Sequence, residues 1–231
     1  MPLQHLENAP LVETIFELRF PGEPRVLTSL DAYYEEVREA FPQVFVPNAQ
    51  PGLAPALQPW EFKSQTGLRW IAISVNAFAF HVRDYVDYKD FKNQVLPLAD
   101  SFCRQYRITG LTRVGTRYLN QILILRPPDK PIPLSNYLNM GFCVPEVIDA
   151  SALEDIHLQL ATRRAGTQLV LGLHYVAQPE SLILDLDCGV VDEVSSSSLA
   201  SHLDTVHGCV EDAFAGLAAH QYMEYMKGET L

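Results

Sequence analysis

Apolar and polar residues alternate near the start of the chain, in the segment LVETIFELRF (11–20). A period of two places successive side chains on opposite faces of a β-strand. One face would carry Val12, Thr14, Phe16, Leu18 and Phe20, and the other would carry Glu13, Ile15, Glu17 and Arg19. The pattern predicts a strand whose first face packs in a hydrophobic core.

Three longer segments repeat their apolar residues every three or four positions, which is typical of amphipathic helices. These segments are 28–41, 87–106 and a C-terminal stretch that begins at about Ser198. The second contains Pro97, which should kink the helix because its ring removes one backbone donor.

Between the first two helices, the segments 60–64 and 68–85 flank the turn QTG and predict a hairpin with a long second strand. If Trp70, Phe78 and Phe80 share one face of that strand, its other face is apolar as well. A strand that is apolar on both faces needs cover on both sides. We therefore expect a second protomer or a protein partner to cover one of them.

The second half of the chain repeats this plan. A strand leads through a proline-rich stretch to a short helix, and three further strands precede the final helix; the segments are 112–125, 134–140, 153–164, 168–177 and 182–189. The repetition predicts a duplication in pattern, since the residues of the two halves do not match well.

We predict an α+β fold in which residues 1–231 form a single compact domain. Two strand–helix–hairpin–helix pseudo-repeats, at about 8–108 and 109–231, would form a mainly antiparallel sheet with helices packed on one face. The second repeat would contain one extra strand.

Composition and charge narrow the classes of partner. Hydrophobic residues make up 48% of the 231 and charged residues 19%, which is a globular composition. With 28 acidic and 17 basic residues the net charge is −11, so binding to nucleic acid is disfavoured. No apolar run approaches the roughly 20 residues that cross a bilayer, so we predict no membrane insertion.

The cysteines bear on the compartment. Cys103, Cys143, Cys188 and Cys209 are scattered without CxxC spacing, and the N-terminus shows no secretory signal. We predict four unpaired thiols in a cytoplasmic protein.

The segment TRVGTRYLN (112–120) raises the main question about function. In a strand, Arg113 and Arg117 lie on the same face as Gly115. If the opening strands of the two halves lie side by side, Glu13 and Glu17 would be the partners of the arginines. One interpretation is a cross-strand ladder of opposite charges. The other is an anion-binding patch, since guanidiniums suit carboxylates and phosphates.

Four blocks of the chain, 8–20, 69–91, 112–120 and 184–214, together resemble a sporadically distributed prokaryotic family of uncharacterised proteins. The features of the resemblance are a Pro-hydrophobic-Glu first strand, a central Arg-x-Gly-x-Arg-Tyr-x-Asn strand and an Asp-x-Asp strand before a long helix. The central motif is carried here by Arg113, Gly115, Arg117, Tyr118 and Asn120. The resemblance implies no activity.

Other candidate chemistry is weaker. Asp185 and Asp187 lie two apart on a strand and could meet His157 and His174 in a metal site, but the spacing favours a solvated polar face. The chain has no GxSxG nucleophile motif and no phosphate-binding loop. We therefore predict neither a metal site nor a cofactor.

The sequence as a whole favours a cytoplasmic binding or protein-interaction module over an enzyme, with a homo-oligomer or a protein as partner. The alternative is a small-anion-binding protein or enzyme with a pocket around Arg113 and Arg117. The candidate binding residues are Arg113, Arg117, Glu13, Glu17, Tyr118 and Asn120.

Overall fold

The computed structural model describes residues 7–47, 52, 54–126, 130, 132–139 and 155–230. In chain order its elements are β1 (Leu11–Arg19), α1 (Pro24–Thr28), α2 (Leu30–Val37), β2 (Gln43–Phe45), η1 (Pro55–Leu57), β3 (Trp60–Lys63), β4 (Arg69–Ser74), β5 (Ala77–Val82), α3 (Tyr88–Tyr106), β6 (Gly110–Leu123), α4 (Leu134–Tyr137), β7 (His157–Arg164), β8 (Thr167–Ala177), β9 (Glu180–Ser195), η2 (Ser196–Ser198), α5 (Leu199–Leu217) and α6 (His220–Met226). The fold is α+β, as the sequence predicts.

All nine strands of the described residues belong to one sheet, in the order β2-β3-β4-β5-β1-β6-β9-β8-β7. Every neighbouring pair is antiparallel. The two opening strands, β1 and β6, lie side by side at the centre, as expected from the sequence. Reading outward from them, β5-β4-β3 on one side corresponds in order to β9-β8-β7 on the other. The duplication itself stays a prediction.

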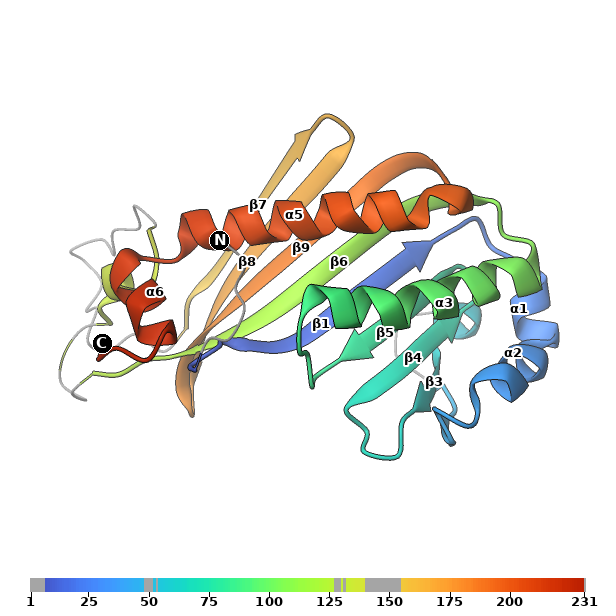
Figure 1. Ribbon diagram of the computed structural model, residues 1–231, viewed down its shortest axis with the longest axis horizontal. Helices are drawn as coiled ribbons and strands as arrows, with labels where there is room; N and C mark the ends of the chain where they lie inside the picture. The colour runs from blue at the N-terminus through green and yellow to red at the C-terminus, as the bar shows by residue number, and fades with distance from the viewer. Residues whose placement is uncertain are drawn as a thin grey trace.

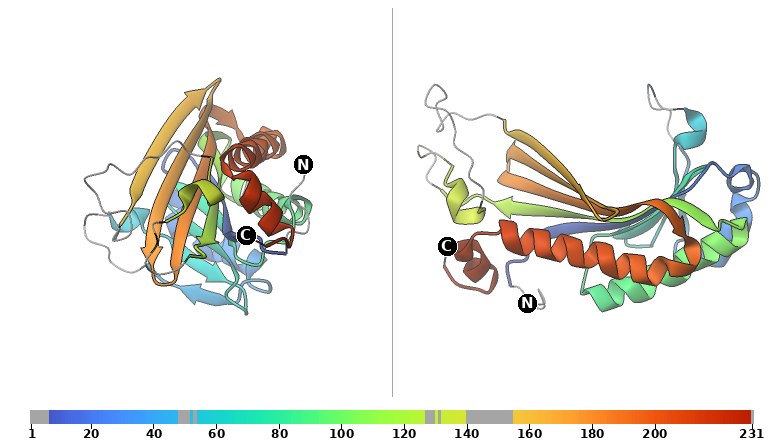
Figure 2. Two further views of the ribbon diagram at one scale, coloured as in Figure 1. Left: turned by 90° about the vertical axis from the view of Figure 1, so that its left-hand side faces the viewer. Right: turned by 90° about the horizontal axis from the view of Figure 1, so that it is seen from above.

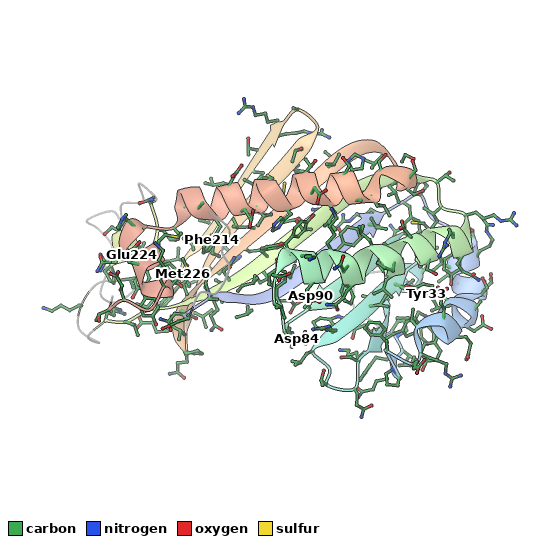
Figure 3. All side chains as sticks on the ribbon, viewed as in Figure 1. Tyr33, Asp84, Asp90, Phe214, Glu224 and Met226 are labelled. Atoms are coloured by element: carbon green, nitrogen blue, oxygen red, sulfur yellow. The ribbon has the colours of Figure 1, made fainter. Side chains whose placement is uncertain are left out.

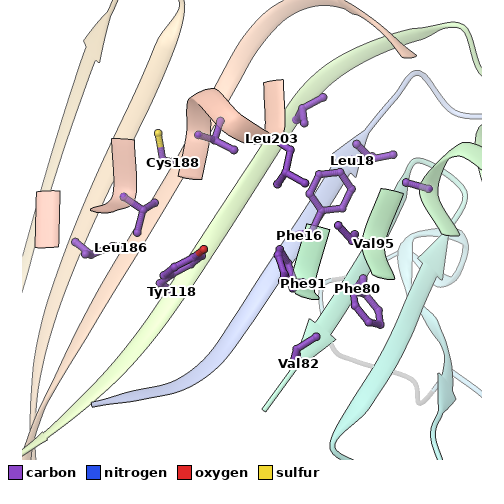
Figure 4. Packing of buried hydrophobic residues seen from close by; sticks show 14 of the residues in the cluster. Phe16, Leu18, Phe80, Val82, Phe91, Val95, Tyr118, Leu186, Cys188 and Leu203 are labelled. Carbon is purple, nitrogen blue, oxygen red and sulfur yellow. The ribbon is translucent and has the colours of Figure 1, made fainter. Parts of the chain in front are cut away.

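Helices α3 and α5 lie across the same face of the sheet, which we call the helix face (Figures 1 and 2). α5 packs over β6, β9 and the near side of β8. α3 packs over β5, where Phe78 and Phe102 lie 4.9 Å apart and Phe80 and Phe91 lie 6.2 Å apart between ring centroids. The apolar side chains of β1 fill the space between the two helices (Figure 4).

The prediction of one long strand at 68–85 is wrong, because a turn at Val75 and Asn76 divides this segment into the two strands β4 and β5. The turn reverses which residues face the helices. Phe78 and Phe80 are buried on the helix face, whereas Trp70 pairs with His81 on the opposite face. On that opposite face the two strands also carry Ala72, Ala77 and Ala79. A second protomer or a protein partner over this face stays a prediction. The extra strand, β2, belongs to the first half.

Two expected helices have other boundaries in the structure, those at 28–41 and 134–140, and the second of them, α4, ends at Tyr137. The helix expected at 28–41 is the shorter α2, which ends at Val37, and the separate helix α1 precedes it. Between the two, the hydroxyl of Ser29 donates to the carbonyl of Arg25 at 2.8 Å. The last helix stops at Leu217, and α6 then folds back so that Met226 and Phe214 are both buried (Figure 3). None of the helices in the described ranges is long and apolar enough to cross a membrane.

Three thiols lie within the described residues, and all three are free: Cys103, Cys188 and Cys209. This agrees with the predicted absence of disulfides. Cys143 lies outside the described residues.

The edge strand β7 packs against little of the rest of the protein. Seven of its eight residues are exposed and one is intermediate. It joins β8 through a two-residue turn in which Ala165 has φ +49° and Gly166 has φ +79°. Positive φ at both positions is the geometry that favours Asn-Gly, and an alanine is strained there.

We predict that Ala165→Asn raises the free energy of unfolding by about 0.5–1 kcal/mol, because asparagine tolerates the left-handed region better than alanine. Urea denaturation measures the gain. Gly166→Ala is the matched opposite change and should destabilise the protein. If both variants unfold at the wild-type midpoint, the turn does not have this geometry in solution.

Candidate functional site

We call the sheet face opposite the helices the open face (Figure 2). At its centre, three charged side chains from β1, β6 and β9 form an ion cluster. Arg113 on β6 donates through Nη1 to Oε2 of Glu17 on β1 at 2.7 Å, and through Nη2 to Oδ1 of Asp187 on β9. Its side chain is only 14% exposed. We call Glu17, Arg113 and Asp187 the Arg113 clamp; it ties together three adjacent strands across the junction of the two halves.

Two glycines make the clamp possible. Gly115 and Gly189 lie opposite each other on β6 and β9. A Cβ at Gly189 would lie 2.7 Å from Nε of Arg113, and a Cβ at Gly115 would overlap the guanidinium itself. The arginine can lie flat on the sheet because both positions lack side chains.

Arg117 is also paired, but with Asp185 on β9. Nε and Nη2 of Arg117 donate to Oδ1 and Oδ2 of Asp185 at 2.8 and 2.6 Å, a bidentate arrangement. Donation to the Asp185 carboxylate raises the pKa of Arg117, against the effect of burial. Nearly half of the Arg117 side chain, 48%, is exposed. Glu17 is therefore a partner of Arg113, as predicted from the sequence, whereas Arg117 pairs with Asp185 and not with Glu13 or Glu17.

Glu13 lies elsewhere on the open face and does not contact the arginines of the motif. Its carboxylate bonds to Nδ1 of His81 at 2.9 Å and accepts from Nε of Arg83 at 3.0 Å. Burial alone would raise its pKa, but these hydrogen bonds outweigh burial and lower it. The reason for the misplacement is register: Ile15, not Glu13, lies opposite Arg117.

Tyr118 and Asn120, the other candidate binding residues, point to the helix face and are buried there. The Tyr118 hydroxyl lies 2.8 Å from Nδ1 of His207, and Asn120 donates to the carbonyl of Leu184 at 3.2 Å. Their even numbers against the odd numbers of the arginines already imply opposite faces of a strand. Including them in one open-face site was therefore wrong.

Beside the Arg113 clamp the open face is hollowed by about 300 Å³. Strands β6, β9, β8 and β7 contribute its polar lining: Arg117, Asp185, Asp187, His174, His157 and Gln159. Gly172 and Val170 of β8 complete the lining. We call this space the hollow.

The two histidines of the hollow form a cross-strand pair. His157 and His174 lie directly opposite each other, with ring centroids 4.3 Å apart and planes at 80°. The same histidines, with Asp185 and Asp187, are the weak candidate for a metal site in the sequence. Among the described residues, no group of three or more His, Cys, Asp or Glu side chains is arranged to hold a metal ion.

A second polar cluster lies between α3 and α5, which we call the helix seam. His207 of α5 stacks on Tyr88 of α3 with centroids 3.6 Å apart, and its Nε2 lies 3.4 Å from Oε1 of Glu211. Asp204 accepts hydrogen bonds from Tyr88 at 2.5 Å and from Lys92 at 2.6 Å. Burial lowers the pKa of His207, although Glu211 and Asp204 oppose the shift.

The helix seam was not predicted from the sequence. The detectable signal was the spacing of His207 from Leu203 and Val210, four and three residues, which places it on the apolar stripe of α5.

Comparison of the chain with protein-family models gives no match, and comparison with curated proteins gives none either. The resemblance drawn from the central motif thus stays a prediction.

We predict that Arg113→Met lowers the free energy of unfolding by about 2–3 kcal/mol, because two partly buried carboxylates lose their shared partner. Arg117→Met should lower it by only about 1 kcal/mol, because this side chain is half exposed and has one partner. Urea unfolding of both variants gives the comparison. If the two variants lose the same free energy of unfolding, the Arg113 clamp stabilises the fold no more than the pair of Arg117 with Asp185 does.

We predict that the protein loses stability as the pH falls below about 6.5, the ordinary pKa of histidine. His207 binds its proton less readily folded than unfolded, so its contribution is full above that pH and is lost as the pH falls through its lower folded pKa. Asp204 and Glu211 limit the effect because they favour the charged ring.

Unfolding free energies measured across this pH range test the point. His207→Gln should flatten the slope, whereas the same change at the exposed His220 should preserve it. An unchanged slope in His207→Gln would assign the pH dependence to other groups.

Proposed function

We propose that this protein is a non-enzymatic binding module that holds a small polar ligand in the hollow of its open face. The observation that carries the proposal is the convergence of six polar side chains from four strands on one space of about 300 Å³. This volume lies at the lower end of the range of small-molecule sites. The cytoplasmic location predicted from the sequence belongs to the same proposal.

Three polar groups of the hollow, those on β6 and β9, support binding because they are held in place before any ligand arrives. Arg117 and Asp185 fix each other through two hydrogen bonds, and Arg113 fixes Asp187. The conformational entropy of these side chains is already lost when the protein folds, so a ligand loses less binding free energy in ordering them.

The pairing also weakens the alternative of an anion pocket around Arg113 and Arg117. Arg113 is engaged on both sides by carboxylates, and its guanidinium lies flat over Gly115 and Gly189. Only Arg117 offers an exposed edge, and Asp185 already occupies its Nε and Nη2 atoms. We retain Arg117 as a ligand-facing residue and assign Arg113 a structural role.

Filling the hollow tests the proposal. Gly172→Leu should block it, because a Cβ at Gly172 already lies 3.3 Å from Nε2 of His174 and 3.4 Å from Cβ of Asp185. Gly110→Leu is the matched control, since a Cβ there meets nothing within 4 Å. The probes are glucose, maltose, myo-inositol, glutamate, citrate, phosphate and spermidine, each scored by the melting temperature.

We expect at least one probe to raise the melting temperature of the wild type and of Gly110→Leu but not of Gly172→Leu. A probe that stabilises all three proteins equally binds outside the hollow. If every stabilising probe behaves in that way, or none stabilises, the hollow is not a binding site for these compounds.

A further inference from the structure

The charges around the hollow balance. Arg117 pairs with Asp185, and Asp187 pairs with Arg113, which also contacts Glu17. Glu17 is in turn 2.9 Å from Nε of Arg19. Three guanidiniums thus face three carboxylates, and each charge has an opposite charge within hydrogen-bonding distance.

This balance disfavours a charged ligand. An anion would compete with Asp185 for Arg117 and would lie close to two carboxylates of the same sign. A cation would compete with Arg113 and Arg117 for the same carboxylates. In either case an existing charge-assisted hydrogen bond would be exchanged for a new one, with little net gain.

The remaining groups suit a ligand that donates and accepts hydrogen bonds at neighbouring atoms. Within the described part of the chain, Asp187 accepts a hydrogen bond from Arg113 at its Oδ1 atom. The Oδ2 atom of Asp187 is left as an acceptor for a ligand. Arg117 has an exposed edge, and Gln159 adds both an amide donor and a carbonyl acceptor. A hydroxyl group donates and accepts at one atom, so it can bridge such a lining.

The shape separates polyhydroxyl compounds from the other common neutral ligands. A nucleobase is usually held between parallel aromatic faces. The aromatic rings in the hollow are those of His157 and His174, which meet at 80° and form no parallel slot. Gly172 and Val170 instead offer a small apolar area against which the C–H groups of a saturated ring can lie.

We infer that the hollow binds a neutral polyhydroxyl compound, a sugar or a cyclic polyol, through Arg117, Asp187 and Gln159. This inference rests on the proposed function and adds the chemical class of its ligand.

Proton NMR of the histidine rings tests the ligand class, because His157 and His174 line the hollow and report on it directly. Glucose, maltose and myo-inositol are titrated at constant pH, and citrate, phosphate and spermidine serve as charged probes. Single His→Gln variants at the two positions assign the resonances. The variant Gly172→Leu, in which the hollow is filled, and the control variant Gly110→Leu, in which it is open, are titrated in the same way.

We expect at least one of the three polyols to shift both ring resonances to saturation in the wild type and in Gly110→Leu, and to leave them unmoved in Gly172→Leu. The midpoint should change less than twofold between low and high salt, because a neutral ligand is not screened.

Two outcomes overturn the inference. If a charged probe alone shifts these resonances, with a midpoint that weakens in salt, the ligand class is wrong while the hollow remains a binding site. If no polyol shifts them, the ligand class is again wrong. The proposed function itself fails separately, when no probe of either kind produces an effect that Gly172→Leu removes.

Discussion

The pairing of β1 with β6 is the interaction on which the rest of the structure depends. Each half of the chain contributes a set of antiparallel strands, and these two central strands join the sets into one sheet. The junction aligns the two helix faces, so that α3 and α5 cover one continuous core (Figure 4). It also aligns the two open faces, and the Arg113 clamp crosses the junction there.

The two faces of β6 show how one strand serves both layers. Its even positions from Val114 to Ile122, including Tyr118 and Asn120, are buried beneath the helices, while Arg113, Gly115 and Arg117 lie on the open face. The presence of a glycine at position 115 is therefore explained by the side chain that lies over it. It leaves room for a guanidinium that bridges carboxylates on both adjacent strands.

The features that could be predicted from the sequence are those that depend on the alternation of residues along a single strand and on the adjacency of the two opening strands. The alternation around Phe16 gave the core face of β1, and the adjacency of the opening strands gave the contact between Glu17 and Arg113. The change from odd apolar positions, at Ile71 and Ile73, to even ones at Phe78 and Phe80 marks the turn that was missed. The pairing of Arg117 with Asp185 could not be predicted, because it depends on the register of strands 68 residues apart.

The position of β7 gives the hollow an unusual wall. His157 and Gln159 come from an edge strand that is almost wholly exposed and paired on one side only. Backbone hydrogen bonds in such a strand open at a lower free energy than those of a buried central strand. Occupancy of the hollow and the ordering of its outer wall are therefore thermodynamically linked. Amide exchange along β7 would slow in proportion to the affinity of whatever the wall encloses.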